Sequence, residues 1–206
     1  MLIRREQPAD APAIARVHRS AFAAVHGTVG ATTNITSAGT TGTSTAATPT
    51  SRENDTAHAA QAGPEPVEVG LVEKLRRDSA WIATLSLVAM EFDEVVGHIC
   101  LTRAAVGPFP ALALGPLGVH ADHQRAGVGS ALMHAAIGAA DALDEPLIGL
   151  LGSLEYYPRF GFVPSARLGI TPDEPRWVSH FQVRALTAFE PQISGEFHYA
   201  EPFYEL

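Results

Sequence analysis

The chain has 206 residues, 46% of them hydrophobic, so it is long enough for one domain of ordinary size with a substantial core. Its formal net charge is −8 and it has no run rich in Lys or Arg, which argues against a nucleic-acid backbone or an anionic membrane as the main partner. Cys100 is the sole cysteine, which excludes an intramolecular disulfide framework and a multi-cysteine metal site.

Neither the histidines nor the first residues carry a recognisable metal or targeting motif. The nine histidines are scattered, and no pair has the His-x-x-x-His spacing that places two ligands on one helical face, so we expect no metal. Residues 1–6 are followed by polar residues and prolines rather than by an apolar run, and no stretch approaches the length of a membrane span. The sequence therefore predicts a soluble, cytoplasmic protein.

The first part of the chain predicts a strand, a helix and an insertion. A strand is expected over residues 2–5, followed by a helix with Asp10 as its cap and Pro12 in its first turn. Residues 27–66 are dominated by Thr, Ala, Gly and Ser and contain no aromatic residue. Such a segment cannot offset its ordering entropy by burial, so we predict a disordered insertion within a single domain spanning residues 1–206.

After the insertion, helices and strands alternate along the chain. Helical spacing resumes over residues 67–77, and two strand-like runs around an acidic turn then predict a hairpin over 81–90 and 95–102. A loop is expected at 108–110. The later elements predicted are a strand at 112–119, a helix from 128 to about 143, a strand at 147–151, a helix at 154–160 and strands at 162–163 and 181–186. This order predicts an α+β fold with a mixed sheet and helices on both of its faces.

The most informative stretch lies between the strand at 112–119 and the helix that follows it. It consists of Gln124, Arg125, Ala126, Gly127, Val128, Gly129 and Ser130. Two glycines one residue apart lack the Cβ atoms that keep a ligand from the backbone, so successive N–H groups can converge on an anion at the positive end of the helix. Arg125 adds a mobile positive charge at the same place.

Spacing separates three phosphate-binding motifs that compete for this stretch. A P-loop requires Lys-Ser or Lys-Thr after its second glycine, whereas Gly129 is followed by Ser130 and Ala131. A dinucleotide fingerprint requires a third glycine where Leu132 stands, and its first glycine close behind the strand. The pattern Gln/Arg-x-x-Gly-x-Gly/Ala is met in full by Gln124, Gly127 and Gly129.

That pattern resembles the pyrophosphate loop of the GNAT superfamily of acetyl-CoA-dependent N-acetyltransferases. Residues 117–119 resemble the Leu-x-Val strand that precedes the loop in this family, and Tyr157, Gly161 and Phe162 resemble its Tyr-x-x-x-Gly-Phe signature. The resemblance covers the chain apart from the insertion, and the first and last residues are similar to those of the YhbS-like subgroup. It implies a three-layer fold with a mixed, mostly antiparallel central sheet.

The resemblance also implies a binding site for acetyl-CoA as co-substrate. In the family, the strand before the loop and the next strand along the sheet part from each other, exposing backbone groups to the pantetheine arm. Many members carry an Asn seven residues before the signature tyrosine, where this chain has Leu150, and Ser153 is a candidate replacement. The implied cofactor contacts are Leu117, Gly118, Val119, Gln124, Arg125, Ala126, Gly127, Val128, Gly129, Ser130 and Ser153.

Acyl transfer from a thioester to an amine requires a neutral amine, a polarised carbonyl and a proton for the leaving thiolate. By resemblance, Tyr157 is the general acid, with Tyr156 as the reserve, and the backbone N–H of Val119 on the parted strand polarises the carbonyl. The expected reaction is direct attack by a primary amine of a small molecule or of a protein.

The general base and the acceptor are not fixed by a motif. His120 directly follows the strand, Glu155 precedes the tyrosines and His98 lies on the hairpin, so all three remain candidate bases. The acidic residues near position 93 either attract a cationic acceptor or form an ordinary solvated turn. The apolar tail at 197–204 is expected to cover a sheet edge or a partner, which leaves a homodimer possible.

Two other hypotheses stay open at this point. One is a module of the same fold that binds acyl-CoA without turnover, as a sensor or a scaffold, although Tyr157 favours the enzyme. The other is a Rossmann-type nucleotide-binding domain, which would bind NAD and not coenzyme A.

Overall fold

The computed structural model describes residues 1–23 and 65–206, so the predicted insertion at 27–66 lies almost entirely outside the described residues. Three α-helices are present in the described part: α1 (Ala11–Phe22), α2 (Val67–Arg77) and α3 (Val128–Asp141). The strands are β1 (Leu2–Arg5), β2 (Trp81–Glu91), β3 (Glu94–Val106), β4 (Phe109–Val119), β5 (Leu147–Leu151), β6 (Val163–Pro164), β7 (Ile170–Pro172), β8 (Phe181–Ala185) and β9 (Gly195–His198).

These strands form one mixed, mostly antiparallel sheet. Its main order is β1-β2-β3-β4-β5-β8-β6, and β9 pairs with the end of β3 and with β7. Along the main order every neighbouring pair is antiparallel except β4 and β5, which run parallel. The predicted fold class is therefore confirmed.

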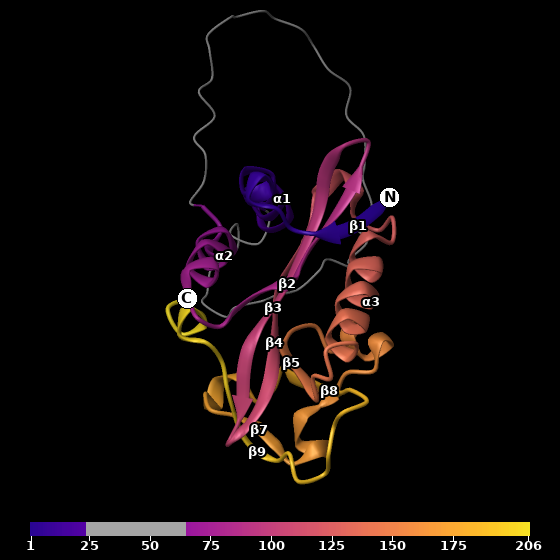
Figure 1. The fold of residues 1–206 in the computed structure, drawn as a ribbon. Helices are drawn as coiled ribbons and strands as arrows, with labels where there is room; N and C mark the ends of the chain where they lie inside the picture. Colours follow the sequence, from indigo (N-terminus) through magenta and orange to yellow (C-terminus); the bar gives the residue numbers. More distant parts are fainter. Residues whose placement is uncertain (24–64) are drawn as a thin grey trace, which may run out of the picture.

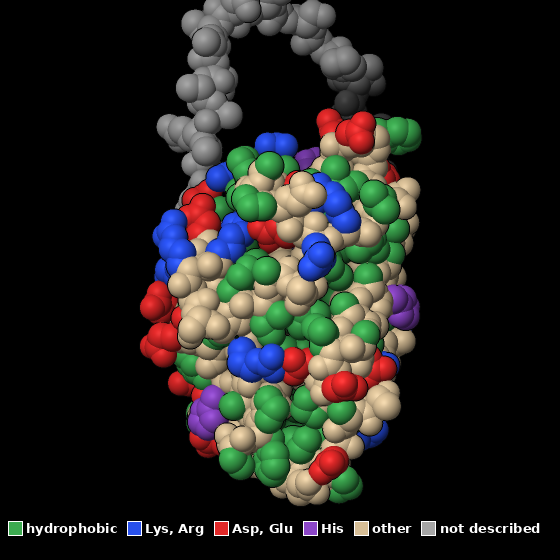
Figure 2. All heavy atoms as spheres, in the orientation of Figure 1, with side chains coloured by type: hydrophobic (Ala, Val, Ile, Leu, Met, Phe, Trp, Pro, Cys, Tyr) green, Lys and Arg blue, Asp and Glu red, His purple; other side chains and the backbone are tan. Residues whose placement is uncertain are grey.

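Helices cover both faces of the sheet, with α1 and α2 on one side and α3 on the other (Figure 1). Strand alternation explains this arrangement, because successive side chains of a strand point to opposite faces. On β3, Ile99 and Leu101 pack in the same cluster as Leu132 of α3, whereas Cys100 between them packs in the cluster that holds Leu71 of α2. On the face shown in Figure 2, acidic and basic side chains are interspersed among hydrophobic ones.

Several local features of the structure differ from the prediction. The helix expected at 154–160 is a single 3-10 turn, Tyr157–Phe160, because Gly161 ends it in the left-handed region with φ 81°. The loop expected at 108–110 is shorter, since Phe109 already pairs with Val106 across the turn. Strands β7 and β9 were not predicted.

Asp10, expected to cap α1, makes no such bond. Its carboxylate accepts hydrogen bonds from the backbone N–H of Gln7 (2.7 Å) and from the guanidinium of Arg4 (2.6 and 2.9 Å). The side chain therefore stabilises the 3-10 turn before α1, η1 (Pro8–Asp10), instead of the helix itself.

The apolar tail packs on its own chain. Phe197, Tyr199 and Phe203 are buried in the same cluster as Leu71 of α2, and Phe203 lies in the last 3-10 turn, η7 (Glu201–Phe203). This segment therefore forms part of the core on the α2 side of the sheet.

A chain of buried polar groups links α1 and α2 to β1–β3. The His18 Nε2 and His98 Nδ1 atoms lie 2.9 Å apart, and His98 Nε2 lies 3.0 Å from the Ser86 hydroxyl. Ser86 donates to the carboxylate of Glu6, which also accepts a hydrogen bond from Arg76 at 2.7 Å. Both imidazoles are fully buried.

Burial is the largest influence on both imidazoles. It lowers the pKa of His18 well below 6.5, and the nearby His98 and Arg76 charges add to this effect. It also lowers the pKa of His98, although the Glu6 carboxylate opposes the shift. Both histidines are therefore neutral in the folded protein at neutral pH.

The first prediction concerns stability against acid. Because the folded-state pKa of His18 is depressed, the unfolded chain takes up a proton near pH 6.5 before the folded chain does. Above about pH 6.5, protonation of His18 therefore takes nothing from the free energy of unfolding. As the pH drops below that value, the free energy of unfolding decreases by at most about 1.4 kcal/mol per pH unit for each histidine that remains neutral when folded. Urea unfolding at a series of pH values checks the slope.

His18→Gln supplies an amide that can replace the hydrogen bond to His98 but cannot titrate, so its slope should be shallower than that of the wild type. His134→Gln, which removes an exposed histidine of α3, is the matched control. Equal slopes in the wild type and His18→Gln would show that His18 is not held neutral by the fold.

Candidate active site

The loop between β4 and α3 has the geometry expected of an anion site. Gly127, the residue before the first turn of α3, has φ 87°, which a residue with a Cβ adopts only with strain. No side chain of the described residues caps α3, so its first-turn N–H groups stay available to a ligand. The Gln124 side chain donates to the Val119 carbonyl at 3.1 Å and ties the loop to the end of β4. Arg125 is exposed beside it.

Next to this loop, β4 and β5 part. Within the described residues they pair at Leu112 with Ile148 and at Ala113 with Gly149. Beyond that point β4 continues along β3 and β5 continues along β8. The parting of these two strands, expected from the resemblance, is thus present.

A β-bulge in β4 lies just beyond the last pair. Two residues of β4, Gly115 and Pro116, stand opposite Cys100 of β3, and the Cys100 thiol donates to the Gly115 carbonyl at 3.1 Å. A bulge bends a strand and re-aims its groups. Here it turns the edge of β4 at the place where β5 has left.

Backbone groups of β4 face the gap. His120 N–H donates to the Val96 carbonyl of β3 at 2.9 Å. Because N–H groups of successive residues point to opposite sides of a strand, the Val119 N–H points away from β3, toward the side that β5 has left.

Tyr157 is buried beside the end of β5. Its side chain is 4% exposed, and its ring occupies the space that a Cβ on Gly152 would need. The ring also meets those of Tyr156 and Phe162 edge-on, with centroids 5.1 and 5.9 Å apart. Burial, with a smaller contribution from the neighbouring Tyr156, raises the pKa of Tyr157 far above 10, so its phenol stays protonated at neutral pH.

Tyr156 serves the other end of the site. A Cβ built on Gly129 would lie 3.0 Å from its hydroxyl, and the Arg159 guanidinium lies over its ring at 4.8 Å. Partial burial raises its pKa, while a hydrogen bond with Ser130 lowers it. The phenol of Tyr156 therefore reaches the first turn of α3, whereas the ring of Tyr157 lies at Gly152, after the end of β5.

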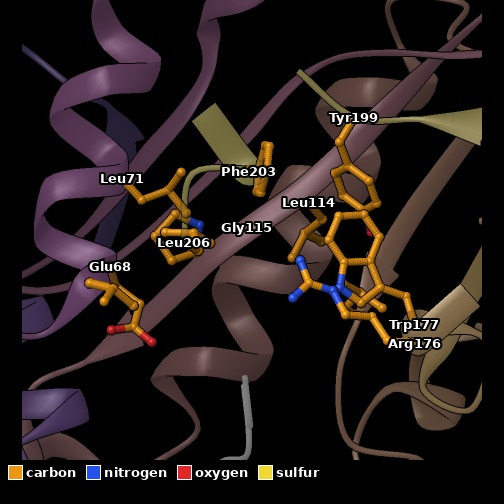
Figure 3. Close-up of a pocket in the computed structure, with 12 residues that line it drawn as sticks. Glu68, Leu71, Leu114, Gly115, Arg176, Trp177, Tyr199, Phe203 and Leu206 are labelled. Atoms are coloured by element: carbon orange, nitrogen blue, oxygen red, sulfur yellow. The ribbon is translucent and has the colours of Figure 1, made fainter. Parts of the chain in front are cut away.

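A pocket of about 40 Å³ opens on the α2 side of the gap. Its walls come from α2, the bulge of β4, the end of β5, the 3-10 turn η6 (Pro175–Trp177) and the tail (Figure 3). The lining residues are Val67, Glu68, Leu71, Leu114, Gly115, Pro116, Leu151, Arg176, Trp177, Tyr199, Phe203 and Leu206. Because Leu114 and Leu151 belong to the two parted strands, the pocket lies at the parting itself.

Tyr157 lies next to this pocket in the fold. Its ring packs on Gly152, which directly follows the pocket-lining residue Leu151. Within the pocket wall, burial raises the pKa of Tyr199 well above 10, and the neighbouring Tyr204 and Asp173 raise it further.

The other predicted site residues lie elsewhere. His120 is partly exposed, with its Nδ1 atom 3.7 Å from the Asp122 carboxylate and its ring near that of His123. Glu91, one of the acidic residues near position 93, has its carboxylate 3.1 Å from the Nδ1 atom of His123. Glu155 is exposed on the turn before the tyrosines. Neither His120 nor Glu155 is among the residues that line the pocket.

Ser153 and His98 have structural partners. The Ser153 hydroxyl accepts hydrogen bonds from the backbone N–H groups of Glu155 (3.3 Å) and Tyr156 (3.2 Å), which shapes the turn that presents Tyr157. His98 belongs to the buried polar chain.

Sequence reasoning missed most of the pocket wall. Glu68, Arg176, Trp177 and Tyr199 come from three separate segments, and none stands in a motif. The only available signal was the aromatic content of the tail. Within residues 1–23 and 65–206, no group of three or more His, Cys, Asp or Glu side chains is arranged to hold a metal. None of the helices described there is long and apolar enough to cross a membrane.

The parted strands, the loop and both tyrosines fall within one family match. Residues 78–164 match the profile of the Acetyltransferase (GNAT) domain, which makes the chain an acyltransferase. The chain is also 32% identical over 144 residues to the uncharacterized N-acetyltransferase YjhQ of Escherichia coli K12, covering 66% of this chain and 79% of YjhQ. The chain belongs to the GNAT family of N-acetyltransferases.

Solved structures share this fold. The GNAT family N-acetyltransferase YhbS from Escherichia coli, in complex with CoA, superposes with a TM-score of 0.73 at 22% identity over 98% of this chain and 91% of YhbS. A GNAT family acetyltransferase from Brucella melitensis, in complex with acetyl-CoA, gives a TM-score of 0.65 at 25% identity over 98% of this chain and 97% of that protein. The resemblance to the GNAT superfamily and to YhbS is confirmed.

Proposed function

We propose that this protein transfers the acetyl group of acetyl-CoA to a primary amine by direct attack, with Tyr157 as the proton donor to the leaving sulfur. The parting of β4 and β5 between the loop and the pocket is the observation that carries this proposal. The structures of YhbS with CoA and of the Brucella enzyme with acetyl-CoA support the choice of donor.

The donor is proposed to lie along the free edge of β4. Its diphosphate binds the first-turn N–H groups of α3 and the loop around Gly127, where the helix dipole favours negative charge. The pantetheine arm then follows β4 toward the bulge. This path leads the thioester past the Val119 N–H, which faces the gap and can polarise the carbonyl.

In the proposed reaction, the amine nitrogen bonds to the carbonyl carbon and the carbon–sulfur bond breaks. Tyr157 gives its phenolic proton to the sulfur, and the amine gives one proton to a base, so the products are an N-acetylamine and coenzyme A. A buried phenol with a raised pKa keeps its proton until a thiolate develops, and burial in the same place also raises the proton affinity of that thiolate.

We assign the base to His120, which takes the proton through a water molecule because it does not line the pocket. Of the three candidates, it alone directly follows Val119 and is partly exposed, with its Nδ1 atom 3.7 Å from the Asp122 carboxylate. His98 is fully buried among the linked polar groups, and Glu155 is exposed on the turn just before the two tyrosines.

Binding of the donor is predicted to depend on Gly127. In Gly127→Glu, both the strained backbone and the added carboxylate oppose an anion, so the affinity for acetyl-CoA should fall by at least about tenfold. Titration calorimetry with acetyl-CoA measures this loss. Gly138→Glu, on an exposed part of the same helix with open space around it, is the matched control and should bind normally. Equal binding by both variants would place the diphosphate elsewhere.

Turnover is predicted to depend on the Tyr157 hydroxyl. Tyr157→Phe should lower kcat by about 100-fold or more, because a general acid typically contributes that much, while the affinity for acetyl-CoA changes little. Steady-state kinetics with a calorimetric affinity tests both parts. Tyr156→Phe, the same change one residue earlier, should act mainly on the affinity for acetyl-CoA and leave kcat largely intact, because its phenol reaches the first turn of α3. Full activity in Tyr157→Phe would remove this phenol from the mechanism.

A third substitution tests the base. His120→Gln should lower kcat/KM about 100-fold, since its amide cannot take the proton of the amine. Glu155→Gln is the control at the competing position and should stay near the wild type. A loss of kcat/KM in Glu155→Gln alone would make Glu155 the general base. No loss in either variant would mean that water accepts the proton without either side chain.

A further inference from the structure

The pocket on the α2 side contains a buried hydroxyl that no described residue of the protein hydrogen-bonds. Tyr199 lines the pocket and is 8% exposed, and its hydroxyl is buried with no hydrogen-bond partner among the described residues. Figure 3 shows its ring entering the pocket beside Trp177. A buried hydroxyl without a partner loses its hydrogen bonds to water and gains none, so a native structure rarely keeps one without a reason.

The backbone of Tyr199 is well anchored, in contrast. Its N–H donates to the hydroxyl of Tyr204 at 2.9 Å, and that hydroxyl donates to Asp173. The ring packs against those of Trp177 (5.2 Å) and Phe203 (5.0 Å). Tyr199 is therefore held firmly in place while its polar atom is left for something else to bind.

Most of the remaining wall is apolar. Leu71, Leu114, Leu151 and Phe203 offer no hydrogen-bonding side chain. Two charged groups border the pocket on opposite sides in Figure 3, the Glu68 carboxylate from α2 and the Arg176 guanidinium from η6. Arg176 also lies over the Trp177 ring at 5.5 Å and 3.5 Å from the Glu174 carboxylate.

We propose that this pocket binds the acceptor, and that the acceptor is a primary monoamine carried on an apolar or aromatic body. This inference rests on the proposed function. The Tyr199 hydroxyl accepts a hydrogen bond from one N–H of the neutral amine, which leaves the nitrogen lone pair free to attack the thioester near Tyr157. The body of the amine lies against the leucines and the aromatic walls.

The same walls disfavour two other classes of amine. An amino sugar would bury hydroxyl groups against leucine side chains, and buried hydroxyls without partners are costly. A polyamine would have to bury a second positive charge against the apolar walls, and the two charged groups at the border, Glu68 and Arg176, have opposite signs and offer it no net attraction. The pocket is therefore expected to select its amine both by favourable contacts with an apolar body and by the cost of burying additional polar groups.

A pair of tyrosine variants tests the role of Tyr199. If its hydroxyl serves the ligand, Tyr199→Phe removes an unpartnered group, so urea unfolding should show no loss of stability. The KM for 2-phenylethylamine should rise about tenfold, the effect of losing one good hydrogen bond, while the affinity for acetyl-CoA stays unchanged. Tyr204→Phe removes a partnered hydroxyl and should lose stability instead. A Tyr199→Phe protein that loses stability and keeps its KM would overturn the proposal.

A panel of amines tests the class of substrate. The value of kcat/KM should be at least about tenfold higher for 2-phenylethylamine and hexylamine than for glucosamine and spermidine, because hydroxyl and ammonium groups lose their hydrogen bonds to water against the apolar wall. Leu206→Asp, at the exposed edge of the pocket, should raise the KM for 2-phenylethylamine, and Leu143→Asp, also exposed and just after the end of α3, should not. Higher kcat/KM for glucosamine or spermidine would overturn the substrate class and leave the proposed function standing.

Direct binding separates this inference from the proposed function. The chain has two tryptophans, so in a Trp81→Phe background Trp177 is the sole tryptophan and reports on the pocket. Addition of 2-phenylethylamine should change its fluorescence with acetyl-CoA present or absent. No change would overturn the pocket assignment even in a protein that binds acetyl-CoA, whereas failure to bind acetyl-CoA would overturn the proposed function first.

Discussion

The site depends on the brief pairing of β4 with β5. Two residue pairs hold these strands together. Beyond those pairs the strands stay apart, because β4 remains paired with β3 and β5 remains paired with β8. At the last pair, the ring of Phe197 from β9 occupies the space that a Cβ on Gly149 would fill, at 2.6 Å from its Cε2 atom. An aromatic ring against a residue without a side chain therefore lies directly beneath the point of separation.

A strand that has lost one neighbour needs support from another direction. For the free part of β4 this support comes from α1, where the ring of His18 lies against Gly118, with Nδ1 2.7 Å from the position of an added Cβ. The Nε2 atom of the same ring is held by His98. The linked buried polar groups thus fix β4 next to Val119, whose N–H faces the gap. They therefore have a positioning role in addition to their effect on stability.

The loop and the paired tyrosines could be predicted from the sequence because their function requires particular residues at fixed spacing. Gly127 needs its left-handed backbone, and Tyr157 needs the space left by Gly152. The amphipathic helix α2 was also predicted with its observed bounds. The pocket wall was not predictable, since Glu68, Trp177 and Tyr199 meet only through tertiary packing. Short strands such as β7 and β9 exist because neighbours pair with them, and their own few residues carry no periodic signal.

Two adjacent tyrosines serve different places in this cleft. Tyr156 extends toward the first turn of α3, and Tyr157 packs on Gly152 at the end of β5. One peptide unit joins them and their ring centroids lie 5.1 Å apart, so a shift of the turn that begins at Ser153 moves both phenols together.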